Sequence, residues 1–245
     1  MSARSQTDST KETYKKNILR LNDGKEIKNY NFLKKTDNIL QKISHLKPNS
    51  QRSYLISIVS TIKGLKGFDM VNKYYYNLMM QMNKDLKVNN TKSETQEKNW
   101  ISQDDVMQVW QNLYDVAFPL LQLKKVNATQ WNEILNFIIL SLYTLNSPRR
   151  NRDYQAMIYL NAPKDLGENF KDFNYMDKDK FLFYSYKTSG TYNCQEIPIS
   201  TELLELLKLY VKLHPLKKNK NPFLLVHYNG EPLDKVNDIT RILNK

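Results

Sequence analysis

The sequence has few of the residue types that metal centres and disulfide frameworks require. Among its 245 residues there is one cysteine, Cys194, and there are three histidines, His45, His214 and His227, which lie far apart. A disulfide framework needs several paired cysteines, and a zinc site needs Cys or His ligands at close spacing. The sequence therefore predicts neither, and we expect no metal and no cofactor.

Long apolar runs are also missing. No stretch approaches the roughly eighteen consecutive apolar residues that suggest a membrane-spanning helix. The N-terminal segment MSARSQTDSTKETYKK has no apolar core of the kind that a signal peptide carries. We therefore expect a soluble, intracellular protein with no membrane partner.

Acidic residues are scarce in the first part of the chain. Residues 1–100 hold 19 Lys and Arg against 9 Asp and Glu, a net charge of +10, whereas residues 101–245 hold 18 against 16, a net charge of +2. An excess confined to one part indicates an anionic partner for that part. Nucleic acid is the commonest such partner, because every neutralised phosphate releases counterions. The alternative is a basic surface that serves only solubility.

The apolar pattern divides the chain into four segments. Residues 1–25 are polar and aperiodic, which predicts a disordered leader. Residues 26–86 carry apolar stripes at helical spacing and many lysines, which predicts a basic helical bundle. Residues 87–99 contain no apolar residue after Val88 and are expected to be a linker. Residues 100–245 then form a second domain.

The second domain is predicted to be α+β and mostly helical. Ser102 and Ser200 each precede an amphipathic stretch with acidic residues in its first turn, so both are expected to cap helices. A largely apolar helix over residues 129–146 ends before Pro148. The short runs QAMIYL, FLFYSY and CQEIPIS predict a three-stranded antiparallel sheet, in which KTSGTYN forms a hairpin turn.

A cluster of arginines follows the apolar helix. Arg149, Arg150 and Arg152 lie within four positions, and a guanidinium group beside a core is costly unless an anion meets it. One interpretation is a solvated helix end at which Arg150 pairs with Asp153 one turn away. The other is a phosphate-binding site. Lys187, in the predicted hairpin turn, could likewise be an ordinary solvated lysine.

The order of these features resembles that of the tyrosine recombinases, the integrase family that breaks and joins DNA through a phosphotyrosine. The resemblance rests on SPRRNRDY and YKTSGTYNCQEIPI, covers roughly residues 28–245, and is greatest with integrases of virophages and other DNA viruses of protists. It implies an N-terminal SAM-like core-binding bundle and a mostly helical catalytic domain with a small three-stranded sheet. It also implies duplex DNA as partner, oligomerisation on DNA and a metal-free reaction.

The resemblance implies roles for individual residues. Residues 147–154 match the spacing of the family's first arginine box, which makes Arg150 the catalytic, phosphate-binding arginine and Asp153 the acid that supports it. Arg149 is the alternative register. Lys187 matches the catalytic hairpin lysine, which donates a proton to the leaving 5′ oxygen. The arginine stabilises charge on the non-bridging oxygens.

The last part of the chain departs from the family pattern. A second arginine box with a histidine, and then the nucleophilic tyrosine, should follow the final helix. His227 and Tyr228 come too early, and Arg241 has no histidine three residues before it. We therefore expect a chain truncated before these residues, and enzymatic activity is left open.

Two other functions fit the sequence. The first is a DNA-binding protein without catalysis, including a decayed integrase. The second is a metal-dependent nuclease or transposase, which would need several carboxylates on its strands to hold Mg²⁺. The three predicted strands contain only Glu196.

Overall fold

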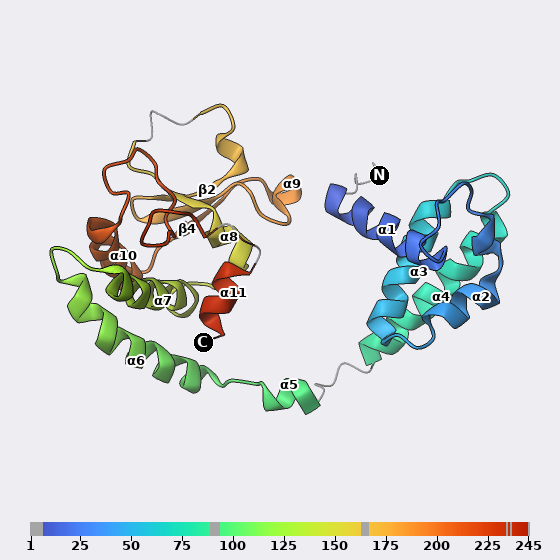
Figure 1. Ribbon diagram of the computed structural model, residues 1–245, viewed down its shortest axis with the longest axis horizontal. Coiled ribbons are helices and arrows are strands. Elements are labelled where there is room, and N and C mark those ends of the chain that lie inside the picture. The colour runs from blue at the N-terminus through green and yellow to red at the C-terminus, as the bar shows by residue number, and fades with distance from the viewer. Residues whose placement is uncertain (1–6, 89–93, 163–166, 234, 236, 245) are drawn as a thin grey trace. The chain divides into compact units, whose positions relative to one another are not determined.

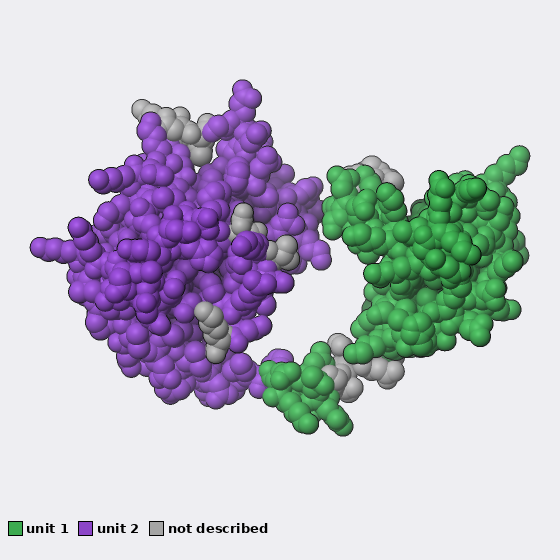
Figure 2. All heavy atoms as spheres, viewed as in Figure 1, with its two compact units in different colours: residues 1–99 green, residues 100–245 purple. Residues whose placement is uncertain are grey.

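A computed structural model of the protein describes residues 7–88, 94–162, 167–233, 235 and 237–244. The chain divides into two compact units, residues 1–99 and 100–245 (Figure 2). This division falls where the predicted linker ends. Helices predominate, and the strands form one small sheet in the second unit (Figure 1). Among the described residues, no helix is long and apolar enough to cross a membrane.

The N-terminal unit consists of helices around a single apolar core. Helix α3 packs against both α1 and α4, and the core is made of isoleucine, leucine and aromatic side chains from successive helices. The elements are α1 (Asp8–Leu21), the 3-10 turn η1 (Asn31–Lys34), α2 (Thr36–Ile43), α3 (Pro48–Ile62), α4 (Asp69–Val88) and α5 (Glu94–Lys98).

Helix α1 contradicts the prediction of a disordered leader over residues 1–25. Ile18 and Leu21 are buried in the core of the unit. Asn17, also buried, donates a hydrogen bond of 2.9 Å to the Ser57 hydroxyl in α3. So few apolar side chains anchor this helix that the sequence shows no helical period. Residues 1–6 of the predicted leader lie outside the described residues.

The predicted linker over residues 87–99 is helical at both of its described ends. Helix α4 continues to Val88, and the short helix α5 begins at Glu94 and contains no buried residue. Glu, Gln and Lys have high intrinsic helix propensity, so a polar segment can be helical without an apolar stripe. Residues 89–93 lie outside the described part of the chain.

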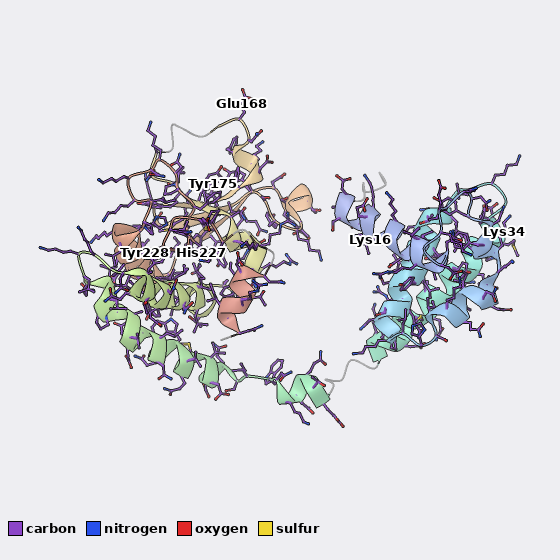
Figure 3. All side chains as sticks on the ribbon, viewed as in Figure 1. Lys16, Lys34, Glu168, Tyr175, His227 and Tyr228 are labelled. Atoms are coloured by element: carbon purple, nitrogen blue, oxygen red, sulfur yellow. The ribbon has the colours of Figure 1, made fainter. Side chains whose placement is uncertain are left out.

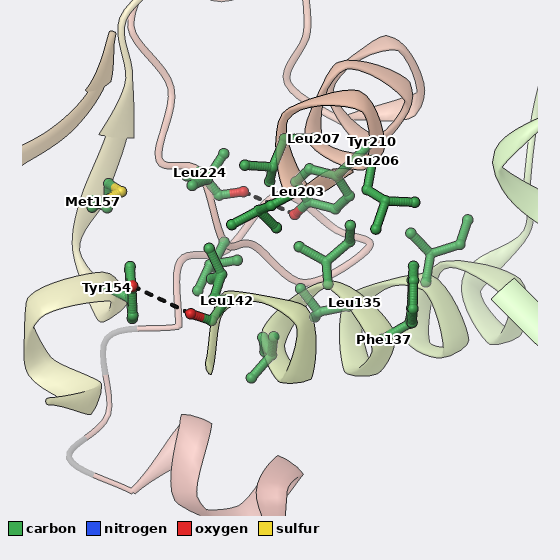
Figure 4. Packing of buried hydrophobic residues seen from close by; sticks show 14 of the residues in the cluster. Leu135, Phe137, Leu142, Tyr154, Met157, Leu203, Leu206, Leu207, Tyr210 and Leu224 are labelled. Carbon is green, nitrogen blue, oxygen red and sulfur yellow. Dashed lines mark hydrogen bonds between the residues drawn. The ribbon is translucent and has the colours of Figure 1, made fainter. Parts of the chain in front are cut away.

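The C-terminal unit is built on two long helices, α6 (Gln103–Leu121) and α7 (Ala128–Thr144), with α10 (Thr201–Leu213) packed against both. The predicted caps are confirmed: Ser102 forms a capping box with Asp105, and the Ser200 hydroxyl accepts a bond from the Leu203 N–H. Figure 4 shows leucines of α7 and α10 packed together, with the Tyr210 hydroxyl donating to a backbone carbonyl, that of Leu224, 2.8 Å away.

The sheet has four strands, not the predicted three, and it is mixed. Its order is β1-β2-β3-β4, with β1 parallel to β2 and the other pairs antiparallel. The strands are β1 (Met157–Tyr159), β2 (Asn174–Asp177), β3 (Lys180–Phe183) and β4 (Gln195–Pro198). The missed strand, β2, buries Asn174, Tyr175 and Met176 in succession, so it lacks the alternation of a half-exposed strand.

Short helices complete the C-terminal unit. Two of them, α8 and α11, lie next to each other, and α11 also packs on α7 (Figure 1). The elements are α8 (Asn151–Gln155), the 3-10 turn η3 (Phe170–Asp172), α9 (Ser189–Tyr192) and α11 (Asp238–Leu243). The site residues predicted from the sequence lie in the segment between α7 and α8, in α8 itself and in the loop that contains α9.

Candidate functional site

Two residues of the arginine cluster, Arg149 and Arg150, lie on the segment between α7 and α8. Helix α7 ends at Thr144, and α8 begins at Asn151 after Arg150, whose backbone is extended at φ −68° and ψ 148°. Successive side chains of an extended segment point to opposite sides. Accordingly, Arg149 turns into the protein whereas Arg150 is exposed, as is Arg152 in α8.

Arg149 is held by three kinds of interaction. Its Nε lies 3.3 Å from Oδ2 of Asp153, and the two side chains are only 18% and 4% exposed. Its Nη1 donates a hydrogen bond of 2.8 Å to Oε1 of Gln195 in β4. Its guanidinium carbon lies 4.3 Å from the ring centre of Phe183 and 5.3 Å from that of Tyr186. An ion pair, a hydrogen bond and two aromatic rings thus fix the orientation of this guanidinium.

The guanidinium group of Arg149 keeps unused hydrogen-bonding capacity. Its Nε is buried without a hydrogen bond of good geometry among the described residues, in spite of the nearby Asp153 carboxylate. Its Nη1 and Nη2 carry four N–H groups, and the one hydrogen bond that these make to a described residue is the Nη1 bond to Gln195. A rigid, charged donor with free N–H groups suits an anion with several oxygens.

Asp153 supports Arg149, and not Arg150 as the sequence analysis expected. Burial raises the pKa of the Asp153 carboxyl, and the charges of Arg149 and Arg150 partly offset that rise. Arg150 contributes a backbone bond, because its carbonyl accepts from the Asp153 N–H at 2.8 Å. The prediction that Asp153 pairs with Arg150 is therefore wrong. The alternative, Arg149, is the arginine that forms the ion pair with the Asp153 carboxylate.

A buried asparagine joins α8 to the loop between β3 and β4. Nδ2 of Asn174 donates to the carbonyl of Asp153 at 2.8 Å and to that of Ser185 at 2.9 Å. Its Oδ1 accepts from the Ser185 N–H at 2.8 Å. These three bonds hold the start of the loop against the helix that carries Asp153. Asn174 was missed from the sequence because its strand was missed.

Lys187 lies in this loop, which is longer than the predicted hairpin turn. The loop runs from residue 184 to 194 and contains the one-turn helix α9. The Tyr186 hydroxyl closes it by donating to the carbonyl of Asn193 at 2.8 Å. Lys187 is exposed and directly follows Tyr186, whose ring contacts Arg149. Lys187 is therefore next in the chain to a residue of the arginine site, and its own side chain is exposed and makes no described hydrogen bond or ion pair with Arg149.

Polar contacts also connect the arginine segment to the last helix. The Tyr143 hydroxyl donates to Oδ1 of Asn151 at 2.8 Å, and Nδ2 of Asn151 donates to the Thr240 hydroxyl at 2.9 Å. Burial raises the pKa of Tyr143 well above its usual value and that of Tyr154 to about 12. Both hydroxyls are therefore neutral at physiological pH, and they act here as hydrogen-bond donors.

The residues that the sequence analysis set aside remain outside the site. His227 and Tyr228, labelled in Figure 3, are exposed, and none of the described hydrogen bonds or ion pairs joins them, or Arg241, to Arg149. Among the residues with described positions, no three His, Cys, Asp or Glu side chains are grouped so that they could hold a metal ion.

Three contacts of Arg149 were not anticipated: Gln195, Phe183 and Tyr186. Phe183 and Gln195 are partners across β3 and β4, so both follow from the strand register, which the sequence pattern did not fix. The alternating aromatic residues of FLFYSY were the available signal for the two rings.

Comparison of the chain with known protein families, with curated proteins and with solved structures finds no match. The function is therefore inferred from the geometry of the site and from the two sequence motifs, SPRRNRDY and YKTSGTYNCQEIPI. The first motif, which contains Arg149 and Asp153, has the better-defined contacts.

Proposed function

We propose that the protein binds duplex DNA and that its C-terminal unit holds one backbone phosphate between Arg149 and Lys187. In this proposal the chain is a relative of the tyrosine recombinases, with Arg149 as the arginine of the first box. The observation that carries it is the Arg149 guanidinium, which Asp153, Gln195 and two aromatic rings fix in one orientation.

A fixed arginine is well suited to a phosphodiester. Its planar group can make two parallel hydrogen bonds to the non-bridging oxygens. Because its neighbours already orient it, little side-chain entropy remains to be lost on binding. Arg150, exposed at the start of α8, adds positive charge beside it, and the 184–194 loop can place the Lys187 ammonium on the same phosphate.

The charge of the N-terminal unit supports DNA as the partner. Residues 1–99 hold 19 Lys and Arg against 9 Asp and Glu, a net charge of +10. In the proposal this helical unit is the SAM-like core-binding domain, the C-terminal unit is the catalytic domain of the family, and several copies assemble on DNA. Electrostatic contacts of this kind act on any DNA sequence.

In a complete family enzyme, cleavage would proceed by attack of a tyrosine on the phosphate that the arginine holds. The first arginine and the lysine have candidates among the described residues, Arg149 and Lys187. A DNA-binding protein without cleavage is the second candidate. It is favoured by the positions of Tyr228 and Arg241, which no described hydrogen bond or ion pair joins to the arginine site.

The test is DNA affinity measured by fluorescence anisotropy with a short labelled duplex. Lys187→Gln and Arg150→Gln remove exposed charges of the site and should each weaken binding about tenfold, equivalent to about 1.4 kcal/mol. Lys124→Gln is the matched control, since Lys124 is exposed in the loop before α7. This loop lies about 25 Å from the arginine segment, at the other end of the helix.

The control should change the affinity less than about twofold, well below the tenfold step of about 1.4 kcal/mol. Equal losses of affinity in all three variants would mean that binding of the duplex depends only on the net charge of the protein. Unchanged affinity for Lys187→Gln and Arg150→Gln would contradict the phosphate site.

A further inference from the structure

The turn between α3 and α4 has an unusual backbone. Two of its residues, Gly64 and Gly67, adopt left-handed conformations at φ +76° and +79°. A Cβ atom added at either position would meet nothing within 4 Å. The space on the Cβ side of both glycines is therefore open, and close packing does not require a glycine at either position.

Several N–H groups of this turn have no hydrogen-bond partner among the described residues. The Leu65 N–H donates to the carbonyl of Ile62, and the Phe68 N–H donates to that of Leu65, each at 3.1 Å. The N–H groups of Gly64, Lys66 and Gly67 donate to no described residue. Successive N–H groups in a turn with left-handed residues form a concavity that suits an anion.

Three lysines belong to this turn or lie next to it. Lys63 and Lys66 are part of the turn. Nζ of Lys34, a residue labelled in Figure 3, lies 4.5 Å from the ring centre of Phe68, which directly follows Gly67. All three are exposed, and none takes part in a described salt bridge. The neighbouring acid in the chain is Asp69. We call Lys34, Lys63, Gly64, Lys66 and Gly67 the α3–α4 turn patch.

Hydrogen bonds between elements of the N-terminal unit fix the backbone next to the patch. The buried Tyr75 of α4 donates to the carbonyl of Leu33 in η1 at 2.9 Å, which fixes the residue before Lys34. Asn72 of α4 donates to the carbonyl of Val59 in α3 at 2.9 Å, which ties together the two helices that the turn connects. Preorganised donors of this kind lose little entropy when a ligand binds.

We propose that the α3–α4 turn patch binds the phosphate backbone of duplex DNA. The free N–H groups contact one phosphate, and the three lysines contact that phosphate and its neighbours. The inference rests on the proposed function, because it assumes that the chain binds duplex DNA, and it adds the element of the N-terminal unit that does so. Contacts of this kind position a protein on the duplex without reading its sequence.

The first test compares two triple variants of the full chain in the same anisotropy assay. The variant Lys34→Gln, Lys63→Gln, Lys66→Gln removes the charge of the patch. The variant Lys73→Gln, Lys84→Gln, Lys87→Gln removes the same charge from the exposed side of α4. Each lost phosphate contact lowers the slope of log K against log salt by about 0.9. Compared with the unmodified chain, the patch variant should therefore have a slope that is smaller in magnitude by about 2.7, and the α4 variant one that is smaller by less than about 1.

The second test observes the backbone directly. In a ¹⁵N-labelled full chain, the amide signals of Gly64, Lys66 and Gly67 should shift when unlabelled duplex is added. The shifts should weaken in the patch variant. Shifts confined to other parts of the chain, or equal slope losses in the two triple variants, would overturn the patch while DNA binding itself stood. No binding of duplex by the unmodified chain would overturn both proposals.

Discussion

Replacing Arg149 by methionine should destabilise the C-terminal unit strongly. Methionine is a flexible apolar residue that fills the space without the charge. The substitution leaves the Asp153 carboxylate, 4% exposed, without its ion-pair partner, and it removes the hydrogen bond to Gln195. Breaking a buried pair from one side costs about 3–5 kcal/mol. Because Arg149 itself is 18% exposed, we expect the lower end, about 3 kcal/mol.

Tryptophan fluorescence measures this effect selectively. All three tryptophans, Trp100, Trp110 and Trp131, belong to the C-terminal unit, and the last two are buried. Urea unfolding of the full chain, followed by this signal, therefore reports the free energy of unfolding of that unit. Arg150→Met is the matched control and should cost less than about 0.5 kcal/mol, as for an exposed surface residue.

Two further measurements test the physical cause. Adding Asp153→Asn to Arg149→Met should recover part of the loss, with a coupling energy of about 1–3 kcal/mol. Burial already raises the Asp153 pKa, and removing Arg149 raises it further. The penalty of Arg149→Met should therefore shrink as the pH falls and the carboxyl takes up a proton. A loss below about 1 kcal/mol for Arg149→Met, with an equal or larger loss for Arg150→Met, would refute the pairing.

Three other substitutions follow from the structure. Asn174→Ala removes three hydrogen bonds that hold the loop; it should cost about 2–3 kcal/mol and speed amide exchange at Ser185. Burial lowers the pKa of His214 to about 4, so the unfolded chain binds a proton first as the pH drops below about 6.5. Stability should then fall by up to about 1.4 kcal/mol per pH unit until about pH 4, and His214→Gln should flatten this profile. Ile18→Ala should cost about 2–5 kcal/mol, seen by circular dichroism with the tryptophan transition unmoved.

The sequence predicted the long helices of the C-terminal unit well, because their caps and apolar faces are local features, and it missed the short helices α8 and α9. Ser102 and Ser200 begin helices as expected, and α7 lies within two residues of the helix predicted over 129–146. Helix α1 and strand β2 were missed for a shared reason. Their burial depends on partners distant in the chain, and neither leaves a regular period in its own residues.

Sequence analysis named Arg149 and Asp153, which form an ion pair, but it expected Asp153 to support Arg150, and it missed the other residues that contact Arg149. The Arg150 assignment rested on the spacing of the family's arginine box, and helical spacing does not decide it, because Arg149 and Arg150 would both be near Asp153 on one continuous helix. The helix begins only after Arg150, whose backbone is extended, so the two arginines point to opposite sides and Arg149 is the one that pairs with Asp153. Gln195 and Asn174 reach the site only through the strand register, which is a property of the folded sheet.

The central claim, a phosphate held by Arg149 and Lys187, is tested most directly by a crystal structure of the protein bound to a short duplex. The account predicts a backbone phosphate within hydrogen-bonding distance of the Arg149 guanidinium, about 3 Å, with the Lys187 ammonium on the same phosphate. A duplex bound elsewhere, with Arg149 contacting only Asp153, Gln195 and the two rings as it does here, would contradict it.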